Sequence, residues 1–438
     1  MKKGFVALLI GLAIIILLSP GIVGRLAERS MDENLDWAAT ESQEVVVTSQ
    51  GFDRGWFSSA GQHRIELREG ELRSAFLAII GDIDSAELPV LIIDTRLDHG
   101  LVPLTSMSRD KGTLVPGLGS AISTLRLEFE NGDQIDVPGT IYSEVGLTGN
   151  LSSNYVLDTG SFELHGETAN WGDTDILVTT NPGNGDIKFA GSIDSLTLAS
   201  SQDNVNVGKV GFSGERRPTT FGFAVGDVEV DVQSIAMRGQ GDAATFGPFS
   251  LSTTTDLAGD RISMKSKLRL ENTPFADLGT AAISVDVELT DVDGVAAGHI
   301  ADALRQLQSD GNEDDFMFVV EDDLQRLLAA GFELHFERLD ISLPQGPITS
   351  NIHISVDASD ANGFVWTSAL LALDANIELS VPAELIDLMT SIDPQVHGAV
   401  GLGYLRKNGD FYETEAKFDK GLLTVNGAPI PLPIPGLR

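Results

Sequence analysis

The regular alternation of apolar and polar side chains is the feature that most restricts how this chain can fold. From about residue 42 onward the dominant period is two residues, which is the period of a β-strand with one apolar and one polar face. A sheet built from such strands is dry on one side, so it must fold over itself or be covered. The clearest runs lie at 228–232, 262–270, 283–290 and 352–356.

Two of these runs carry opposite charges at their polar positions. The first includes Lys265, Lys267 and Arg269, whereas the second includes Asp286 and Glu288. Opposite charges on neighbouring strands stabilise a sheet when they lie side by side. If these two strands pair, the basic polar face of one lies beside the acidic polar face of the other, which is a favourable arrangement.

Turn-forming residues separate the runs at short intervals, and their Asn, Gly, Asp and Pro content favours tight turns between antiparallel strands. We therefore predict a mainly β fold, a long curved antiparallel meander sheet with a few short helices. Near Glu337 and Arg338 the apolar phase slips by one residue, which predicts a β-bulge. The turn segments are 131–133, 148–150, 181–186 and 408–410.

Helical spacing of apolar residues is rarer. One stripe contains Ile300, Leu304 and Leu307, and a second runs from Met317 to Leu328, with the acidic segment 309–315 between them. This pattern predicts a pair of helices inserted between β regions. The segment 382–389 predicts a further short helix with a proline at its first turn.

The N-terminus has the character of a membrane anchor. An uncharged, apolar stretch from Gly4 to Gly24 follows Lys2 and Lys3, and as a helix it would be about 31 Å long, enough to span a bilayer core. The lysines hold that end in the cytoplasm. We expect a single-pass protein of the bacterial inner membrane, with its large domain in the periplasm. A cleaved signal peptide is the alternative, although Pro20 and bulky neighbours make a poor cleavage site.

These patterns predict five segments along the chain. Residues 1–24 form a transmembrane signal anchor and residues 25–41 a juxtamembrane helical stalk. A β-rich domain over 42–295, a helical insertion over 296–331 and a C-terminal β region over 332–438 follow. The pattern leaves open whether the part after residue 41 is one domain or two.

Composition limits the partners and the chemistry. The chain has 29 basic and 64 acidic residues, a net charge of −35, which repels nucleic acid and anionic lipid headgroups. The same acidity also serves solubility in saline surroundings. Because there is no cysteine, disulfides, thiol catalysis and thiolate metal sites are excluded.

No motif for catalysis or metal binding is evident. The seven histidines never lie three or four residues apart, and no phosphate-binding loop or nucleophile motif occurs. Asp291 and Asp293 begin like a calcium loop but lack its later ligands. We interpret these two, and the spaced pairs 82/84 and 173/175, as solvated turn carboxylates. We expect a protein without cofactor or metal that is not an enzyme.

One cluster is unusual in composition. Residues 51–59 combine two glycines, an arginine and three aromatic residues within a short stretch that follows a strand-like run. A bulged or kinked strand whose rings join the core is the favoured interpretation. A recognition patch built from the same rings is the alternative.

Several motifs together resemble one family. The segment Phe52-Asp53-Arg54-Gly55-Trp56-Phe57-Ser58-Ser59 is similar to the Tyr-x-Arg-Gly-x-Phe-Ser-Ser signature of the YdgA-like bacterial proteins, a family known as a domain of unknown function. The segment Asp98 to Pro103 resembles that family's His-Gly-Pro element, with Leu101 in place of its proline. The lysine-led anchor and the C-terminal segments 403–412 and 420–427, which end in Asn-Gly, agree as well.

The resemblance implies a membrane-anchored periplasmic protein and supplies no reaction. It marks eight positions whose role it leaves open: Arg54, Gly55, Trp56, Phe57, His99, Gly100, Asn426 and Gly427. Gly55 and Gly427 are expected to allow positive φ or close backbone approach, and His99 to end a strand.

We therefore expect a non-enzymatic protein of the bacterial envelope. Its curved sheet would hold a lipid or another apolar ligand on its dry face, and its partners would include the inner membrane but no nucleic acid. A structural or protein-interaction scaffold in envelope maintenance, as a homodimer, is the alternative. A hydrolase of envelope polymers is a third hypothesis, which requires two convergent carboxylates.

Overall fold

The computed structural model describes most of the chain after residue 44. The described residues are 45–54, 58–67, 89–99, 119–129, 132–146, 148, 150–164, 167–181, 183–199, 203–239, 242–275, 278–310, 316–357, 371–390 and 393–430. The predicted anchor and stalk lie outside them. Over the described ranges, no helix has the length and apolar character needed to cross a bilayer.

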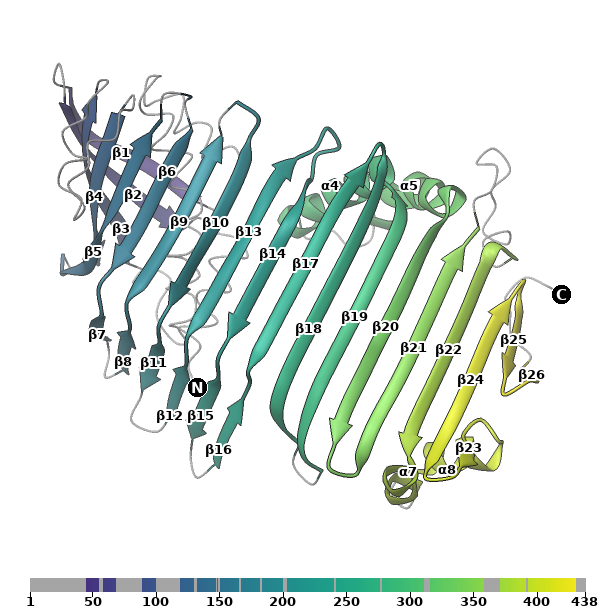
Figure 1. The fold of residues 1–438 in the computed structure, drawn as a ribbon. Coiled ribbons are helices and arrows are strands. Elements are labelled where there is room, and N and C mark those ends of the chain that lie inside the picture. The colour runs from purple at the N-terminus through teal and green to yellow at the C-terminus, as the bar shows by residue number, and fades with distance from the viewer. Residues whose placement is uncertain are drawn as a thin grey trace. The chain divides into compact units, whose positions relative to one another are not determined.

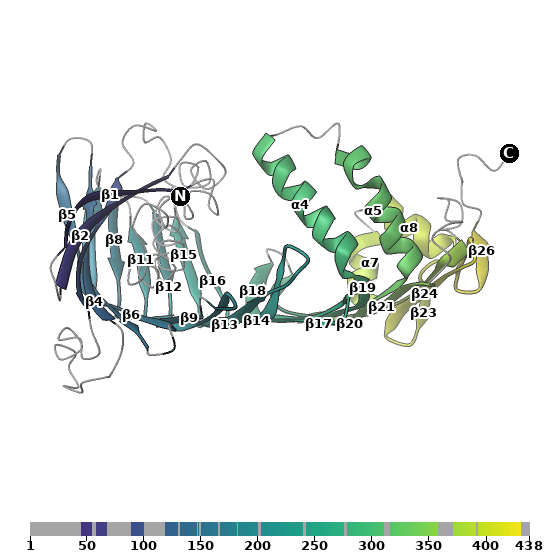
Figure 2. The same cartoon turned by 90° about the horizontal axis from the view of Figure 1, so that it is seen from above.

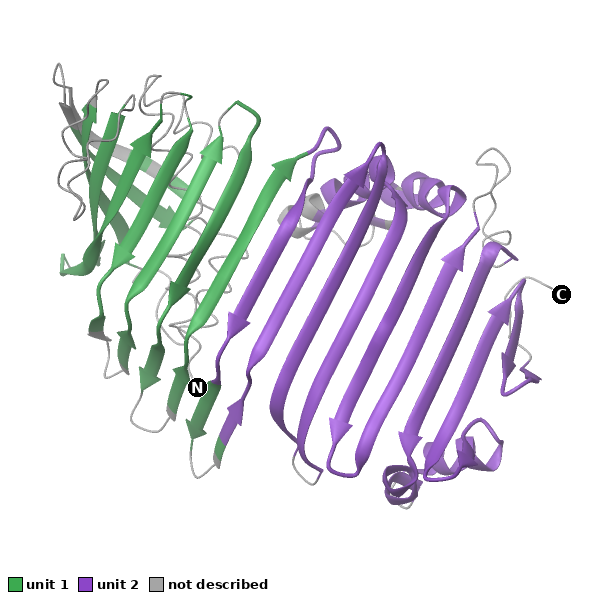
Figure 3. Cartoon of the chain, in the orientation of Figure 1, with its two compact units in different colours: residues 1–218, 235–243 green, residues 219–234, 244–438 purple. Residues whose placement is uncertain are grey.

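The chain forms two compact units, which are coloured separately in Figure 3. Unit 1 contains residues 1–218 and 235–243, and unit 2 contains residues 219–234 and 244–438. Both are built mainly from antiparallel strands, and the described helices are few and short. The prediction of a mainly β fold is therefore confirmed, while the five predicted segment boundaries stay predictions.

The main sheet of unit 1 is an antiparallel meander (Figure 1). Its strands pair in the order β1, β2, β3, β4, β5, β6, β9, β10 and β13. Their bounds are Val45–Arg54, Ser58–Leu67, Val90–His99, Gly119–Glu128, Gln134–Val145, Leu151–Leu157, Thr174–Asn181, Asp186–Ile193 and Val210–Pro218.

A second sheet of unit 1 continues the strands of the first. It pairs β7 (Gly160–Leu164), β8 (Glu167–Trp171), β11 (Leu196–Ala199), β12 (Asp203–Val207) and β15 (Ile235–Gly239) in that order. A strand β16 (Asp242–Phe246) follows and crosses the unit boundary at residue 243.

A two-residue break separates the two sheets on each of four consecutive strands. The breaks are 158–159, 172–173, 194–195 and 208–209, and we call this line the crease. Backbone bonds continue across it, since Gly172 N donates to Ser195 O at 2.9 Å and Asp194 N donates to Asp173 O at 3.0 Å. The breaks consist of Asp, Gly, Ser, Thr and Lys, of which the first four are typical of turns. The breaks thereby divide the strands of one meander between two sheets.

Side chains stabilise the crease. The backbone N and the hydroxyl of Thr159 both donate to one carboxylate oxygen of Asp173, at 3.0 and 2.7 Å. Lys209 forms an ion pair with Asp194 at 2.8 Å. The Trp171 indole donates to the Asp158 carbonyl at 3.1 Å and lies against the bare Cα of Gly160.

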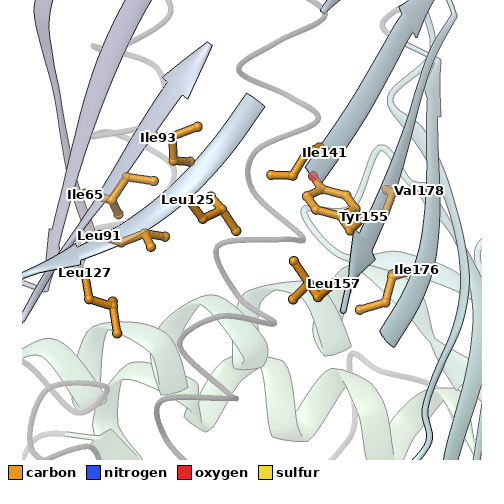
Figure 4. Close-up of a cluster of buried hydrophobic side chains, with 10 residues drawn as sticks. All are labelled: Ile65, Leu91, Ile93, Leu125, Leu127, Ile141, Tyr155, Leu157, Ile176 and Val178. Atoms are coloured by element: carbon orange, nitrogen blue, oxygen red, sulfur yellow. The ribbon is translucent and has the colours of Figure 1, made fainter. Parts of the chain in front are cut away.

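The apolar side chains of unit 1 are collected on one face of the main sheet (Figure 4). Register explains this, because Ile93 lies opposite Leu125 and Tyr155 lies opposite both Ile141 and Ile176. Tyr155 is 0% exposed. The buried cluster is Ile65, Leu91, Ile93, Leu125, Leu127, Ile141, Tyr155, Leu157, Ile176 and Val178.

The same face also buries four hydroxyl side chains. Thr95 and Ser123 lie 2.8 Å apart, and Ser143 and Ser153 lie 2.9 Å apart, each joined by a hydrogen bond between hydroxyl oxygens. Paired in this way, the hydroxyls avoid the cost of a buried, unsatisfied polar group. These four hydroxyls are therefore satisfied within the dry face of unit 1.

Unit 2 is also an antiparallel meander. Its strands pair in the order β14, β17, β18, β19, β20, β21, β22 and β24, and β23, β25 and β26 complete the edge beyond β24. The bounds are Ala224–Val232, Phe249–Ala258, Arg261–Phe275, Gly279–Asp293, Phe332–Leu343, Gly346–Val356, Leu373–Pro382 and Phe411–Asp419, then Arg406–Asn408, Leu422–Val425 and Ala428–Ile430.

The two long strands with opposite charges are neighbours in the sheet, so the favourable charge arrangement is present. In β18 and β19, Lys265 lies opposite Glu288 and forms an ion pair with it at 2.8 Å. Arg269 and Asp286 form another at 2.6 Å. The predicted bulge is also confirmed at Glu337, because Arg338 and Phe336 pair with consecutive residues of β19.

Four helices accompany the described part of unit 2. The pair α4 (Gly294–Asp310) and α5 (Phe316–Ala330) lies between β19 and β20, where the apolar stripes predict helices. The pair α7 (Ala383–Thr390) and α8 (Pro394–Gly401) follows β22. The segment predicted as a third short helix corresponds to α7, with Pro382 as the last residue of β22 rather than within the helix.

Asp293 joins the first helical pair to the sheet, and its interpretation as a solvated turn carboxylate is wrong. It is buried at the end of β19, accepts a hydrogen bond from Ala296 N at 2.9 Å, and binds both Nε and Nη2 of Arg326 on α5, at 3.0 and 3.2 Å. A helix start leaves backbone N–H groups unpaired, and this carboxylate satisfies one of them. Asp291 beside it is exposed, with φ of 61°.

Substitution of Gly160 tests the packing at the crease. A Cβ at this position would lie 2.2 Å from Cζ2 of Trp171 and 2.8 Å from Cγ of Pro138. We expect Gly160→Ala to lower the free energy of unfolding by about 1–3 kcal/mol, measured by urea denaturation. Gly211→Ala on β13 is the control, because no heavy atom lies within 4 Å of a Cβ there. Equal effects of the two variants would contradict the prediction.

The carboxyl of Asp173 gives a pH-dependent test. The hydroxyl and then the backbone N–H of Thr159 hold the pKa of Asp173 below its ordinary value. Because the folded-state pKa is depressed, this interaction stabilises the fold above the ordinary pKa and is lost as pH falls through the folded-state pKa. We expect Thr159→Val to raise the pKa of Asp173 in a carboxyl NMR titration. Thr197→Val, which is paired with Asn206 instead, should leave it unchanged.

Candidate functional site

Several rows of apolar side chains cross the sheet of unit 2, among them three of five residues each. In the first, on β19 to β24, the successive register partners are Val287, Phe336, Ile352, Ile377 and Ala416. A parallel row contains Leu289, Leu334, Ile354, Ala375 and Phe418. The third contains Val230, Leu251, Leu268, Val285 and Leu339, from β14 to β20. We call these fifteen side chains the open apolar face.

The open apolar face is only partly shielded from solvent. None of its members is buried, and Ile377 is 37% exposed. The equivalent apolar face of unit 1 is buried throughout its core cluster. The alternation is the same in both units. In unit 1 the apolar face packs against itself, because the buried cluster and the residues packed on it lie on, or directly after, strands of that one sheet.

Helices occupy the two ends of this face and leave its middle uncovered by described residues. Leu385 and Ile386 of α7 pack with Leu343, Ile348 and Leu379 at one end of the strands. At the other end, α4 follows β19 and α5 precedes β20. Figure 2 shows both helical pairs on the same side of the sheet. From β14 to β24 the face spans seven strand spacings, about 34 Å at ~4.8 Å each.

The opposite face of the same sheet is polar. Besides the ion pairs of β18 and β19, it carries His335 and His353 directly opposite each other, with ring centroids 5.3 Å apart. Asn351 Nδ2 lies 3.2 Å from Nε2 of His335. The sheet of unit 2 therefore has one wet side and one dry, incompletely covered side.

The two N-terminal motif segments meet at one end of unit 1. Arg54 is the last residue of β1 and lies opposite Ser59, and His99 is the last residue of β3 and lies opposite Gly119. The expected kink is present as a register shift around residue 51. Positions 55, 56, 57 and 100, and the side chains of Arg54 and His99, lie outside what the structure describes.

Asp98 is the side chain at this meeting point that the sequence patterns did not single out. It lies opposite Ser58 on one side and Ser120 on the other, and it is 5% exposed. Among the described residues, its Oδ2 has no hydrogen-bond partner, and Oδ1 lies 3.9 Å from Nε of the exposed Arg96. The chain has 64 acidic residues, and the sequence signal that distinguishes Asp98 from the others is its position directly before His99 of the family motif.

The C-terminal motif has a structural role. Asn426 and Gly427 form the two-residue turn between β25 and β26, with φ of 49° and 78°, which fits the Asn-Gly preference of a type I′ hairpin. The amide of Asn426 donates to the carbonyls of Gly403 and Tyr404, both at 3.0 Å. Its oxygen accepts from Glu415 N at 2.9 Å. Asn426 thus connects three segments of unit 2.

The remaining described histidines lie apart from any metal-like cluster. His63 is buried on the dry face of unit 1, where burial lowers its pKa and favours the neutral ring. Its Nδ1 has no hydrogen-bond partner among the described residues. His299 pairs with Asp323 at 2.9 Å between α4 and α5. In the portion of the chain that the structure covers, no three His, Asp or Glu residues form a group suited to a metal ion.

These features define a class of protein: a two-unit, mainly β molecule with antiparallel meander sheets, one of which has an incompletely covered apolar face. The chain belongs to a bacterial family of unknown function, described as "Bacterial protein of unknown function (DUF945)", whose model matches residues 1–433. No curated protein matches the chain. No solved structure matches it either.

Substitution of Asn426 separates its backbone conformation from its hydrogen bonds. Asn426→Gly keeps the positive φ but removes three hydrogen bonds, so we expect a loss of about 1–3 kcal/mol in the free energy of unfolding. Asn426→Ala should cost about 1 kcal/mol more, because it also disfavours the left-handed conformation. The control is Asn408→Ala, which removes one exposed bond to Glu413. Denaturation curves in which all three variants coincide would refute this role.

Proposed function

We propose that this protein is a non-enzymatic, membrane-anchored periplasmic protein of the bacterial envelope, of the YdgA-like kind, which holds the hydrocarbon part of a lipid on the open apolar face of unit 2. The observation that carries the proposal is the contrast between the closed dry face of unit 1 and the uncovered one of unit 2. Contiguous exposed apolar surface is costly and in soluble domains commonly marks a binding site.

The chemistry of the face favours hydrocarbon as its occupant. The fifteen side chains are all aliphatic or phenylalanine and offer no hydrogen-bond donor or acceptor. The backbone groups between them are engaged in the strand ladder. An acyl chain requires no hydrogen bonds, whereas a peptide laid on this surface would leave its own polar groups unpaired.

The rest of the chain supports the same proposal. A helix over 1–24 would keep the domain beside a membrane that supplies lipid. The net charge of −35 disfavours anionic headgroups, so the proposed ligand is neutral or zwitterionic.

Site-specific photocrosslinking in membranes tests the proposal. A photoreactive residue replaces Val285 on the open apolar face of the full chain, and the matched control replaces Ser284, whose side chain points to the polar face. We expect a lipid adduct, detected by mass spectrometry, at position 285 but not at position 284. Phe336→Asp in the same background should reduce the adduct about tenfold, since burying a phenylalanine contributes about 1.5–3 kcal/mol.

The other outcomes of the crosslinking experiment each favour a different function. A protein adduct at position 285 in place of lipid would support the scaffold hypothesis, and an adduct with a second copy of the chain would support a homodimer through this face. Equal lipid adducts at both positions would indicate non-specific contact with the bilayer and would contradict the proposal.

A further inference from the structure

We infer that His335 and His353, on the polar face of unit 2, together bind a divalent transition-metal ion, with copper(II) held most tightly. The two residues lie directly opposite each other on β20 and β21, and their ring centroids are 5.3 Å apart. Both residues are partly exposed, so an ion reaches them from solvent. Strand register brings them together, which explains why no spacing within the sequence indicated this pair.

The distance between the two rings fits two ligands on one ion. Bonds from imidazole nitrogen to a metal are about 2.0–2.1 Å long, so two such nitrogens lie about 3 Å apart. Rings with centroids 5.3 Å apart reach that separation when one nitrogen of each turns toward the other. Opposite positions on antiparallel strands hold the two Cβ atoms about 4.5–5.5 Å apart, and the strand ladder fixes that spacing.

The hydrogen bond that His335 makes requires the form of the ring that binds metal. Asn351 Nδ2 lies 3.2 Å from Nε2 of His335. Because an amide nitrogen donates and does not accept, this contact requires a lone pair on Nε2, and the ring is then neutral. A metal ion uses the same lone pair, so ion binding would replace the hydrogen bond from Asn351.

Water would complete the coordination of the ion. Over the ranges that the structure describes, no three His, Asp or Glu residues are grouped for a metal, so the pair leaves positions open. Asn376 is the register partner of His353 on β22. Its buried Oδ1 has no hydrogen-bond partner among the described residues, while its Nδ2 donates to Glu378 at 3.3 Å. That oxygen is an acceptor for a metal-bound water, the kind of outer contact that orients a metal site.

The charges around the pair favour a cation. The row that crosses the sheet through the two histidines also contains Lys265 and Lys417, and each of these lysines is engaged by a glutamate. Glu333 lies two residues before His335 on the same face, and it is exposed. The carboxylate of Glu378 adds further negative charge on this side. A divalent ion is therefore attracted and not repelled.

The type of ligand decides which metals fit. Imidazole nitrogen suits zinc, copper and nickel, whereas calcium and magnesium take oxygen ligands. Among the divalent ions of the first transition row, affinity for a given site is highest for Cu²⁺. Structural zinc sites use four protein ligands, so a site with two protein ligands suits an ion that binds reversibly.

Copper binding to the full chain in detergent tests the inference, with Cu²⁺ alone as the probe. We expect calorimetry to show a single tight site above the weak binding of surface carboxylates, and electron paramagnetic resonance to show coupling to imidazole nitrogen. His335→Gln and His353→Gln should each weaken this site at least about tenfold. Acidification to about pH 5.5 should release the ion, because protons compete for the same nitrogens.

His299→Gln is the matched control. His299 is exposed and lies beside a carboxylate, 2.9 Å from Asp323, but on helix α4. We expect this variant to bind Cu²⁺ as the unsubstituted protein does. An equal loss in His299→Gln would indicate scattered binding and would contradict the inference. Full affinity in either His335→Gln or His353→Gln, or no tight site in the unsubstituted protein, would also overturn it.

Asn351→Ala gives a second test that leaves both ligands in place. This substitution removes the hydrogen bond to Nε2 of His335, so Cu²⁺ should bind as tightly as before or more tightly. A loss of the tight site in this variant, with its circular dichroism unchanged, would show that the inference is wrong. The histidine pair lies on the face opposite the open apolar face, so these measurements do not depend on lipid binding.

Discussion

The constraint on which the rest of the structure depends is the register of the antiparallel ladder. When every strand alternates, direct pairing of apolar with apolar residues keeps one face of the sheet dry across all strands, and a slip of one residue would turn a whole strand inside out. The bulge at Glu337 shows how the fold maintains this. The apolar phase of β20 changes there, and the extra residue restores apolar pairing with β19 on both sides of the bulge.

Polar interactions then act on a scaffold that the ladder has already arranged. Charged pairs such as Lys265 with Glu288 lie on the wet face, where solvent weakens them. They therefore help to select which strands become neighbours but add little to the stability of the fold. The ends of the strands differ. Asp293 and Asn426 each satisfy several groups that the ladder leaves unpaired, at a helix start and at a hairpin respectively. These residues connect elements that the strands alone would not position.

The edge of the unit 2 sheet is protected as well. The outer edge of β24 is shared between β23 and β25, and the last described strand, β26, has three residues and contains Pro429. Short edge strands and proline oppose the addition of a further strand from another molecule. The open apolar face remains partly exposed, whereas the core cluster of unit 1 is buried.

Local periodicity was sufficient to determine part of this protein from its sequence. The β class, the bulge at Glu337 and the helices between β19 and β20 all follow from the spacing of side chains over a few residues. The spacing of apolar residues within one segment decides which side chains share a face, and this depends only on residues close together in the sequence.

Only the tertiary structure decided the rest, because it depends on contacts between distant segments. The crease requires breaks at 158–159 and 172–173 to come into register. The buried Asp293 at the end of β19 has its ion-pair partner, Arg326, on helix α5. Asp98 meets Ser58 and Ser120 from other strands. The same alternation of apolar and polar residues gives a buried face in unit 1 and a partly exposed face in unit 2. The two-residue period specifies which side of a sheet is apolar, but it does not specify how that side is shielded from water.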